Sequence, residues 1–452
     1  MTAKIMKVLA VSLALWSAAE AAHAESPPPL PLSLDQAITR GLDRNLSALL
    51  AKTRVDEAEG TRERRVANYL PHLRLETPFA WQTRNLRAQG ITLPNAPAVV
   101  GPFTSYDFRI YADQNILDLQ SYHAIKAAEE EQKARQLDYR DVRGQVIRQV
   151  AVQYINAAYA EARVATARSR VETSEVLEKL AADQRAAGVA DGLDVLRAQV
   201  QLANDRQYLL VTRNNAELAR LSLARGVGLD LGTPIALTDA LAFKKLEGPQ
   251  IAQAVQAALE IRPDYRSLHS QRASLEEQMK ASRSRYLPRI VLSGNYGTSG
   301  QEMGKLDPSG MIQVNLVMNL FDHDRKGERM ELDSRLKRND EQIADLKLGV
   351  EQDIREALLN LNSATDQVLT ARQGLTLAEK ELQYASDRFK NGIANNIEVV
   401  TAQDALARAR DNELNALAQH VEAKIALARA LGDTEKAYRL FLGIESHEDM
   451  NR

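Results

Sequence analysis

The residues that come nearest to a chemical site are a glycine-containing stretch and one acidic cluster. Residues 300–306 (Gly-Gln-Glu-Met-Gly-Lys-Leu) are similar to a phosphate-binding loop, but the stretch is one residue short and Leu306 stands where that loop needs a hydroxyl group. Asp322, His323 and Asp324 form a lone group, and the seven histidines are scattered without the spacing of metal ligands. The sequence therefore predicts no catalytic residue, no metal site and no cofactor, and we do not expect an enzyme.

The charge balance and the lack of cysteine narrow the classes of function further. The 58 basic and 60 acidic side chains leave a formal net charge of −2, which favours no nucleic-acid partner because a broad basic face is missing. Many of these charges stand four residues apart in opposite-sign pairs, which is typical of solvated helix faces. Without cysteine the chain has no disulfide framework, no thiolate metal site and no lipid-bearing cysteine.

Residues 1–24 have the features of a secretory signal peptide. Lys4 and Lys7 precede a short apolar run at residues 8–18, and residues 22–24 (Ala-His-Ala) match the small-x-small cleavage rule. The apolar run is too short to span a bilayer, and no later stretch of about 18 uncharged apolar residues occurs. We predict cleavage after Ala24 and a periplasmic, extracellular or outer-membrane location.

The remainder of the chain carries an internal duplication. Residues 69–71 (Tyr-Leu-Pro) recur at 286–288, and residues 115–118 (Asn-Ile-Leu-Asp) correspond to 319–322 (Asn-Leu-Phe-Asp). The two offsets differ, so a loop of unequal length must lie between these motifs. The predicted segments are a first repeat at 25–246, a second repeat at 247–435 and a C-terminal tail at 436–452.

Each repeat contains two amphipathic stretches with the period of a β-strand. Ile312, Val314 and Leu316 alternate with Gln313 and Asn315, so that one face is apolar and the other polar. Strands of about ten residues with this pattern are typical of outer-membrane barrels, and a small soluble sheet with one wet face is the alternative. The expected strands cover about 72–83 and 104–117 in the first repeat, and about 289–298 and 310–321 in the second.

Very long helices follow each strand pair. Helices are expected over about 120–228 and 325–432, each interrupted by one tight turn, at Gly188 and Gly392. An uninterrupted helix of about 67 residues is roughly 100 Å long, which exceeds any single globular core and belongs in a coiled coil, a solenoid or a tunnel. Four strands cannot close a barrel, and lipid does not tolerate an open sheet edge, so a membrane sheet requires several copies of the chain.

These features together resemble the TolC-like outer membrane efflux protein family. The resemblance rests on the duplicated Tyr-Leu-Pro, on Asn-Leu-Phe-Asp at 319–322, and on residues 388–392 (Arg-Phe-Lys-Asn-Gly) followed by Val399 and Gln403. It implies a mainly α fold with a transmembrane β-barrel part, built from a duplicated helix–β-hairpin–long helix–helix unit. In such a homotrimer a twelve-stranded barrel in outer-membrane lipid continues into an α-helical periplasmic tunnel.

The function implied by this resemblance is that of a passive exit channel in the cell outer membrane. A tripartite efflux or type I secretion system uses such a duct, in which an inner-membrane pump supplies the energy and a periplasmic adaptor protein connects the two. The cargo, whether drug, metal, solvent or polypeptide, is left open. A periplasmic coiled-coil adaptor or scaffold is the alternative function, although neither accounts for the duplicated strand pairs.

The resemblance also implies a periplasmic gate at the tip of the helices. Glu398 corresponds to an acidic position that constricts the tunnel in the family, and Thr401 stands where a second acid is common. Asp194 corresponds to the acceptor of a link between helix pairs, but Phe389 and Ala394 lack the hydroxyl and guanidinium groups of its usual partners, and Arg388 is a candidate replacement. The alternative role of Glu398 is that of a solvated residue favoured by the helix dipole.

The strand alternation assigns side chains to the two faces of the expected barrel. The aromatic belt at the membrane interface is expected to contain Phe79, Trp81, Tyr106 and Phe108, with ordinary sheet packing as the alternative. The expected lumen residues are Arg109, Arg289, Asn295, Gln313, Asn315 and Asn319.

Overall fold

The protein is described by a computed structural model that covers residues 28–91, 94, 97–188, 191–391, 393 and 396–443. The predicted signal peptide at 1–24 lies outside the described residues. The chain divides into two compact units, each assembled from separate stretches. Of the described residues, the helical unit comprises 28–48, 143–254 and 353–443, and the sheet unit comprises 49–142 and 255–352.

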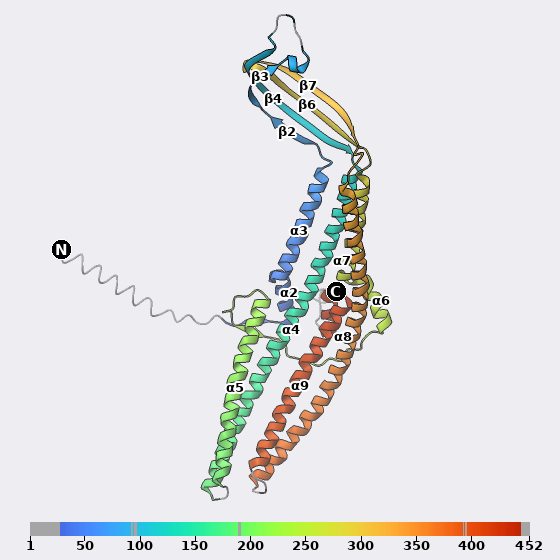
Figure 1. The fold of residues 1–452 in the computed structure, drawn as a ribbon. Helices are drawn as coiled ribbons and strands as arrows, with labels where there is room; N and C mark the ends of the chain where they lie inside the picture. Colours follow the sequence, from blue (N-terminus) through green and yellow to red (C-terminus); the bar gives the residue numbers. More distant parts are fainter. Residues whose placement is uncertain are drawn as a thin grey trace, which may run out of the picture. The chain divides into compact units, whose positions relative to one another are not determined.

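The sheet unit contains one antiparallel sheet (Figure 1). Strand β4 (Val99–Leu117) pairs with β6 (Arg289–Glu302), and β6 pairs with β7 (Lys305–Val317). The other edge of β4 pairs with both β2 (His72–Glu76) and β3 (Phe79–Asn85). The sheet therefore has two open edges in a single chain, one at β7 and one at β2 and β3.

Two strand boundaries differ from those expected. The stretch 72–83 is divided into β2 and β3, with Pro78 in the gap, because proline has no N–H to donate to a ladder. Strand β6 extends beyond residue 298, and strand β7 begins before residue 310. A two-residue turn at Met303 and Gly304 joins them. Residues 299–309, which lie between the two expected strands, are thus mostly strand.

The sheet unit also contains α3 (Leu46–Ala67), α7 (Pro263–Ser284) and parts of α4 (Leu119–Ala186), α6 (Ile251–Ile261) and α8 (Asp324–Lys390). Serines let α7 approach α4 closely, since Ser274 Oγ donates to Ala127 O at 2.8 Å and Ser267 Oγ donates to Ala134 O at 3.2 Å. The helix-to-strand junction is fixed by Asn115 Nδ2, which donates to Asn68 O at 2.8 Å.

The helical unit holds the remainder of α4 and α8 together with α2 (Leu34–Arg44), α5 (Gly192–Gly226), α9 (Asn396–Leu431) and α10 (Thr434–Leu442). A short parallel pair, β1 (Leu30–Leu32) with β5 (Ile235–Leu237), lies in the same unit, and α6 (Ile251–Ile261) crosses its boundary. Helices α4 and α8 contain 68 and 67 residues. Their apolar faces are buried, with Ile354, Leu361 and Val368 fully inaccessible on α8.

The ends of the long helices are set by glycine and by local packing. Gly188 follows α4 in the left-handed conformation, with φ of +74°, which glycine adopts without steric cost. The expected turn at Gly392 lies outside the described residues.

The expected tail at 436–452 contains most of α10, which is anchored because the buried Tyr438 donates its hydroxyl to Asp35 at 2.8 Å. Among the described helices, none is long and apolar enough to cross a membrane.

Candidate channel lining and gate

One face of the sheet is a polar network. Residues opposite each other in an antiparallel pair point to the same face, so the register places Arg109, Asn295 and Ser309 on neighbouring strands of one face. Arg109 Nη1 donates to Asn295 Oδ1 at 2.7 Å, and Arg109 Nη2 donates to Ser309 Oγ at 3.0 Å. On the same face Asn315 Nδ2 donates to Ser293 Oγ at 2.9 Å. These contacts bind β4, β6 and β7 together through polar side chains.

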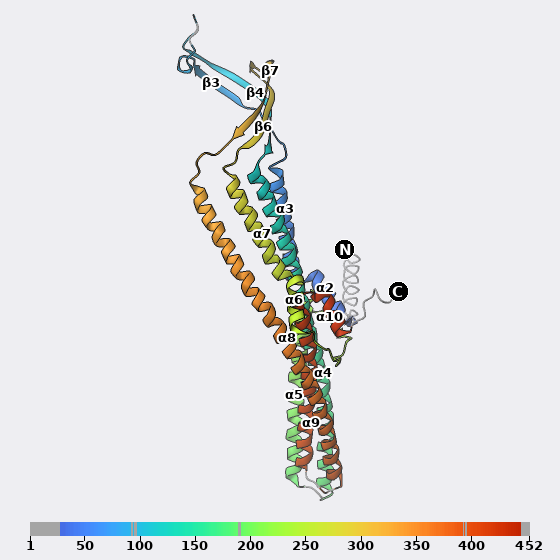
Figure 2. The same ribbon diagram turned by 90° about the vertical axis from the view of Figure 1, so that its right-hand side faces the viewer.

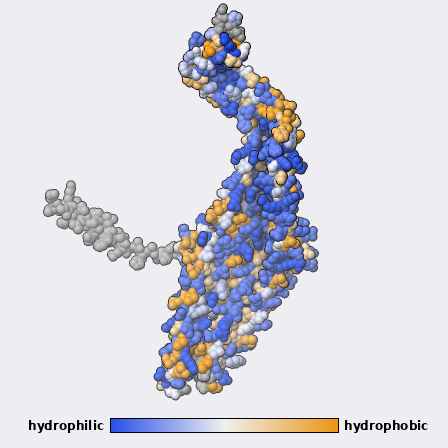
Figure 3. Space-filling model, in the orientation of Figure 1, coloured by the Kyte–Doolittle hydropathy of each residue, from blue (hydrophilic) through white to orange (hydrophobic). Residues whose placement is uncertain are grey.

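The opposite face of the sheet is apolar and exposed. Ile312, the most accessible of its residues, exposes 84% of its surface, and Val314 and Leu316 beside it are similarly open. Figure 3 shows apolar residues gathered over β6 and β7. Phe79 and Tyr106 lie on this face with their ring centroids 5.2 Å apart. Such a face is costly in water, and it indicates contact with lipid or another apolar surface.

The structure separates the two sets of residues assigned from the alternation. The four expected belt residues, Phe79, Trp81, Tyr106 and Phe108, share the apolar face. The polar face carries five of the six expected lumen residues, which are Arg109, Arg289, Asn295, Gln313 and Asn315. Asn319 does not join them, since β7 ends at Val317.

The residues expected at the gate lie at the ends of the helices of the helical unit. Glu398 is in the first turn of α9 and forms an ion pair with Arg388 of α8, with Nε and Oε2 3.3 Å apart. Thr401 is exposed one turn further on. Asp194 is in the first turn of α5 and pairs with Arg197 of the same helix at 3.6 Å. Both acidic residues thus occupy positions that a helix dipole favours.

Two details differ from the expected gate. Arg388, considered as a partner for Asp194, binds Glu398. Phe389 is only 4% exposed and packs in a core cluster with Leu177 of α4 and Val399 of α9, so it is a packing residue that joins three helices. Ala394 lies outside the described residues.

A polar network that the sequence analysis missed joins α4, α5 and α9, which run side by side in Figures 1 and 2. Arg170 Nη2 lies 2.7 Å from Asp205 Oδ1 and 3.1 Å from Asp404 Oδ1. Arg163 lies 3.4 Å from Asp411 and donates to the hydroxyl of Tyr208, which in turn donates to Asp411 at 3.0 Å. We call this set, Arg163, Arg170, Asp205, Tyr208, Asp404 and Asp411, the ionic ladder.

The ionic ladder is partly buried, which strengthens its electrostatics. Asp205 is 2% exposed, and Ser174 Oγ donates a further hydrogen bond to its carboxylate. Burial raises the pKa of Tyr208, because desolvation disfavours the phenolate. Burial by itself lowers the pKa of Arg163, but the hydrogen bond to Tyr208 and the charge of Asp411 outweigh it, so the pKa is raised overall. The guanidinium therefore stays charged.

A signal for the ionic ladder is present in the sequence. The two arginines on α4 stand seven residues apart, as do Asp404 and Asp411 on α9. Arg163, the earlier arginine, meets Asp411, the later aspartate, as two antiparallel helices in register require. Only the pairing of these two heptad spacings could have identified the contact.

Comparison with known proteins assigns the chain to a family. The family profile described as "Outer membrane efflux protein" matches residues 37–229 and 254–433, one match for each repeat. The chain belongs to the outer membrane efflux protein family. This efflux protein is accordingly an outer-membrane exit channel, and the two matches follow the duplication found in the sequence.

Relatives cover most of the efflux protein at low identity. The pyoverdine export outer membrane protein OpmQ of Pseudomonas aeruginosa is 23% identical over 409 residues, which are 88% of this chain and 85% of the relative. The toluene efflux pump outer membrane protein TtgF of Pseudomonas putida is 24% identical over 342 residues, which are 73% of this chain and 68% of the relative.

Solved structures share the fold. The CmeC outer membrane channel of Campylobacter jejuni superposes with a TM-score of 0.78 and 15% identity, covering 92% of this chain and 90% of that one. The outer membrane protein VceC of Vibrio cholerae gives a TM-score of 0.75 and 18% identity, covering 88% and 96%. The predicted mainly α fold with a β part is confirmed.

Proposed function

We propose that three copies of the efflux protein share one twelve-stranded barrel in the outer membrane. The observation that carries this proposal is the two-faced sheet with open edges. Its apolar face suits lipid, its polar face with Arg109, Asn295 and Asn315 suits a water-filled lumen, and its edges at β7 and at β2 and β3 require neighbours. The break at Pro78 leaves β2 and β3 acting as one interrupted strand, so each copy supplies four.

Apolar stripes on the helical unit support the same assembly. Exposed Leu196, Val200 and Leu210 follow one side of α5. Exposed Leu359, Leu377 and Tyr384 follow α8, and Figure 1 shows α5 and the lower part of α8 flanking α4 and α9. If α5 of one copy packs against α8 of the next, both stripes leave water, which removes a large apolar surface from solvent.

The partners that we propose are an inner-membrane pump and a periplasmic adaptor protein. Names of relatives refer to pyoverdine export and to efflux pumps for toluene. We therefore propose a tripartite system that exports small organic molecules, with the efflux protein as its passive duct and with no catalysis in the duct itself. The gradient or nucleotide that drives transport belongs to the pump.

The gate that we propose combines the ionic ladder with the tip. The ladder fastens α9 to α4 and α5 through Arg163 and Arg170, so opening requires these ion pairs to separate. At the tip Glu398 supplies one carboxylate per copy, and its pair with Arg388 partly neutralises that charge. Asp194 and Thr401 would border the same opening, whereas Phe389 holds the helices behind it.

The experiment that tests the channel is reconstitution of the purified mature chain. We expect detergent-extracted material to run as a heat-sensitive trimer by light scattering and electrophoresis, and to give discrete conductance steps in a planar bilayer. A chain that is monomeric and stable in buffer without detergent would contradict the proposal. That result would favour the periplasmic adaptor or scaffold.

A further inference from the structure

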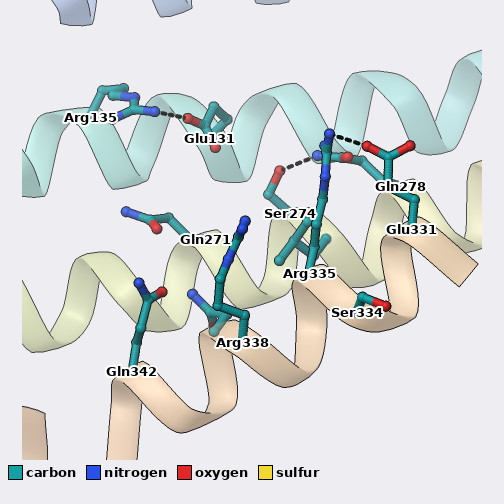
Figure 4. Close-up of a pocket in the computed structure, with 12 residues that line it drawn as sticks. Glu131, Arg135, Gln271, Ser274, Gln278, Glu331, Ser334, Arg335, Arg338 and Gln342 are labelled. Carbon is teal, nitrogen blue, oxygen red and sulfur yellow. Dashed lines mark hydrogen bonds and ion pairs between the residues drawn. The ribbon is translucent and has the colours of Figure 1, made fainter. Parts of the chain in front are cut away.

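A polar groove of about 650 Å³ lies in the sheet unit, outside the residues of the proposed gate. Helices α4, α7 and α8 line it, and Figure 4 shows Arg335 and Arg338 extending from α8 toward α7 and α4. A second groove of about 400 Å³ between α3 and α4 shares Glu131 and Arg135 with the first. The two grooves thus form a continuous polar surface across four helices.

Guanidinium groups are in excess along the larger groove. Glu131 forms an ion pair with Arg135 of the same helix at 2.6 Å. Glu331 likewise forms an ion pair with Arg335 of its own helix. Arg338 also lines the groove, is exposed, and has no ion-pair partner among the described residues. It stands three residues after Arg335, so both guanidiniums lie on one helix face, where like charges repel. A bound anion would relieve that repulsion.

A buried amide provides a second and independent sign of a ligand. Asn339 lines the groove and is only 4% exposed, yet its Oδ1 accepts no hydrogen bond from any described residue. A buried polar atom without a partner is unfavourable, and such an atom marks a place where something else completes the bond. A ligand that donates a hydrogen bond would complete this site, and it would lie close to the guanidinium of Arg338, which has no ion-pair partner among the described residues.

We propose that this groove binds a hydroxycarboxylate group of small organic molecules as they pass along the duct. Arg338, with Arg335, receives the carboxylate, since the planar guanidinium fork matches its two oxygens. A hydroxyl group of the same molecule donates to Asn339 Oδ1. This inference rests on the proposed function, because the groove can meet cargo only if the face of α4, α7 and α8 that carries it borders the lumen.

The test uses single-channel recording of the reconstituted full chain, with citrate as the hydroxycarboxylate probe. Citrate should block the current transiently, with a dissociation constant obtained from the dwell times. Arg338→Gln should weaken citrate block roughly tenfold, as expected for loss of a charge-assisted contact. Lys337→Gln is the matched control, because it removes the same charge one residue away on α8 from a side chain that does not line the groove. It should leave the block unchanged.

The hydroxyl contact is tested with tricarballylate, which is citrate without its hydroxyl group. The native channel should bind citrate more tightly than tricarballylate, and Asn339→Leu should abolish that difference while the conductance stays normal. Equal weakening by Arg338→Gln and Lys337→Gln would overturn the inference, since only the net charge of the duct would then matter. So would a conducting channel that citrate does not block, although the proposed channel would stand. A chain that never conducts would instead refute the proposed function itself.

Discussion

In the sheet unit the apolar side chains of Ile312, Val314 and Leu316 are exposed, and the polar side chains of the opposite face hydrogen-bond to one another. In the helical unit, by contrast, the apolar side chains of Ile354 and Leu361 on α8 are fully buried. The same free energy of apolar burial acts in both regions, but the surroundings differ. A helix in water turns its apolar stripe inward, and a strand in lipid turns it outward. The contrast therefore supports the proposal that the sheet unit is the part of the chain that contacts the bilayer.

The largest effect is expected from a charge placed on the apolar face of the sheet. Val314→Arg should abolish trimer formation, because an arginine at mid-bilayer costs about 2–4 kcal/mol in each copy. Gln313→Arg, on the adjacent residue and the polar face, should leave assembly intact. Heat-modifiability on electrophoresis, after folding into vesicles, measures the difference. Equal behaviour of the two variants would mean that the apolar face does not contact lipid.

A change of comparable size is expected in the helical unit when the ionic ladder loses a cation. Arg170→Ala leaves the 2% exposed carboxylate of Asp205 without its guanidinium, which costs about 3 kcal/mol for a buried charge. We expect a lower urea midpoint together with a higher open probability. Arg206→Ala on α5, which breaks only the exposed pair with Glu175 of α4, serves as the control and should change neither. An unchanged open probability in Arg170→Ala would remove the ladder from the gate.

A moderate effect on stability is expected from pH. His420 is fully buried, and the centroid of its ring lies 4.9 Å from that of Phe243. Burial, the larger cause, and the charge of Lys424, the smaller one, lower the pKa of His420 to about 4. In the unfolded chain the pKa is about 6.5, so between pH 6.5 and 4 only the unfolded state binds the proton. The free energy of unfolding should fall by about 1.4 kcal/mol per pH unit as pH decreases through this window, and the contribution is fully present above pH 6.5.

The control for this pH dependence is His420→Phe, which keeps a ring in the core and removes the titrating group. Urea midpoints of the detergent-solubilised protein at several pH values should give a shallower slope for this variant between pH 6.5 and 4. Identical slopes would show that other groups govern acid sensitivity.

The smallest effect on stability is expected at the exposed tip. Arg388→Ala should change the free energy of unfolding by less than about 1 kcal/mol, because its pair with Glu398 is open to solvent. Its effect on conduction should nevertheless be measurable, since the unpaired Glu398 then attracts cations more strongly. Reversal potentials in a salt gradient should shift toward cation selectivity in Arg388→Ala and away from it in Glu398→Ala. Unchanged selectivity in both would remove Glu398 from the conduction path.

The sheet was the part of the fold most accessible from sequence. Period-two alternation assigns each side chain to a face without any knowledge of its partners, which is why the expected belt residues and most of the expected lumen residues lie on opposite faces of the sheet. Asn319 lies beyond β7 because the alternating pattern continues past Val317, where β-pairing stops. The division at Pro78 follows from the missing N–H and could have been anticipated.

The helical contacts were less accessible, since an apolar stripe reveals a buried face but not the helix that covers it. The ionic ladder joins residues more than 200 positions apart, such as Arg170 and Asp404, and depends on the relative rotation of three helices. The family resemblance predicts a gate position for Phe389, whereas its apolar side chain is buried in a core cluster. Arg388 is expected from the sequence to pair with Asp194, whereas the structure pairs it with Glu398.

The two open edges of the sheet are unlike one another, because β7 is one continuous strand and the other edge is broken at Pro78. Copies that join β7 to the broken edge of a neighbour associate head to tail, and such contacts close only as a ring. A chain whose β7 cannot pair would leave a gap however many intact copies surround it. When the defective chain is produced together with the intact one, mixed assemblies should therefore fail to close. The defect would be genetically dominant.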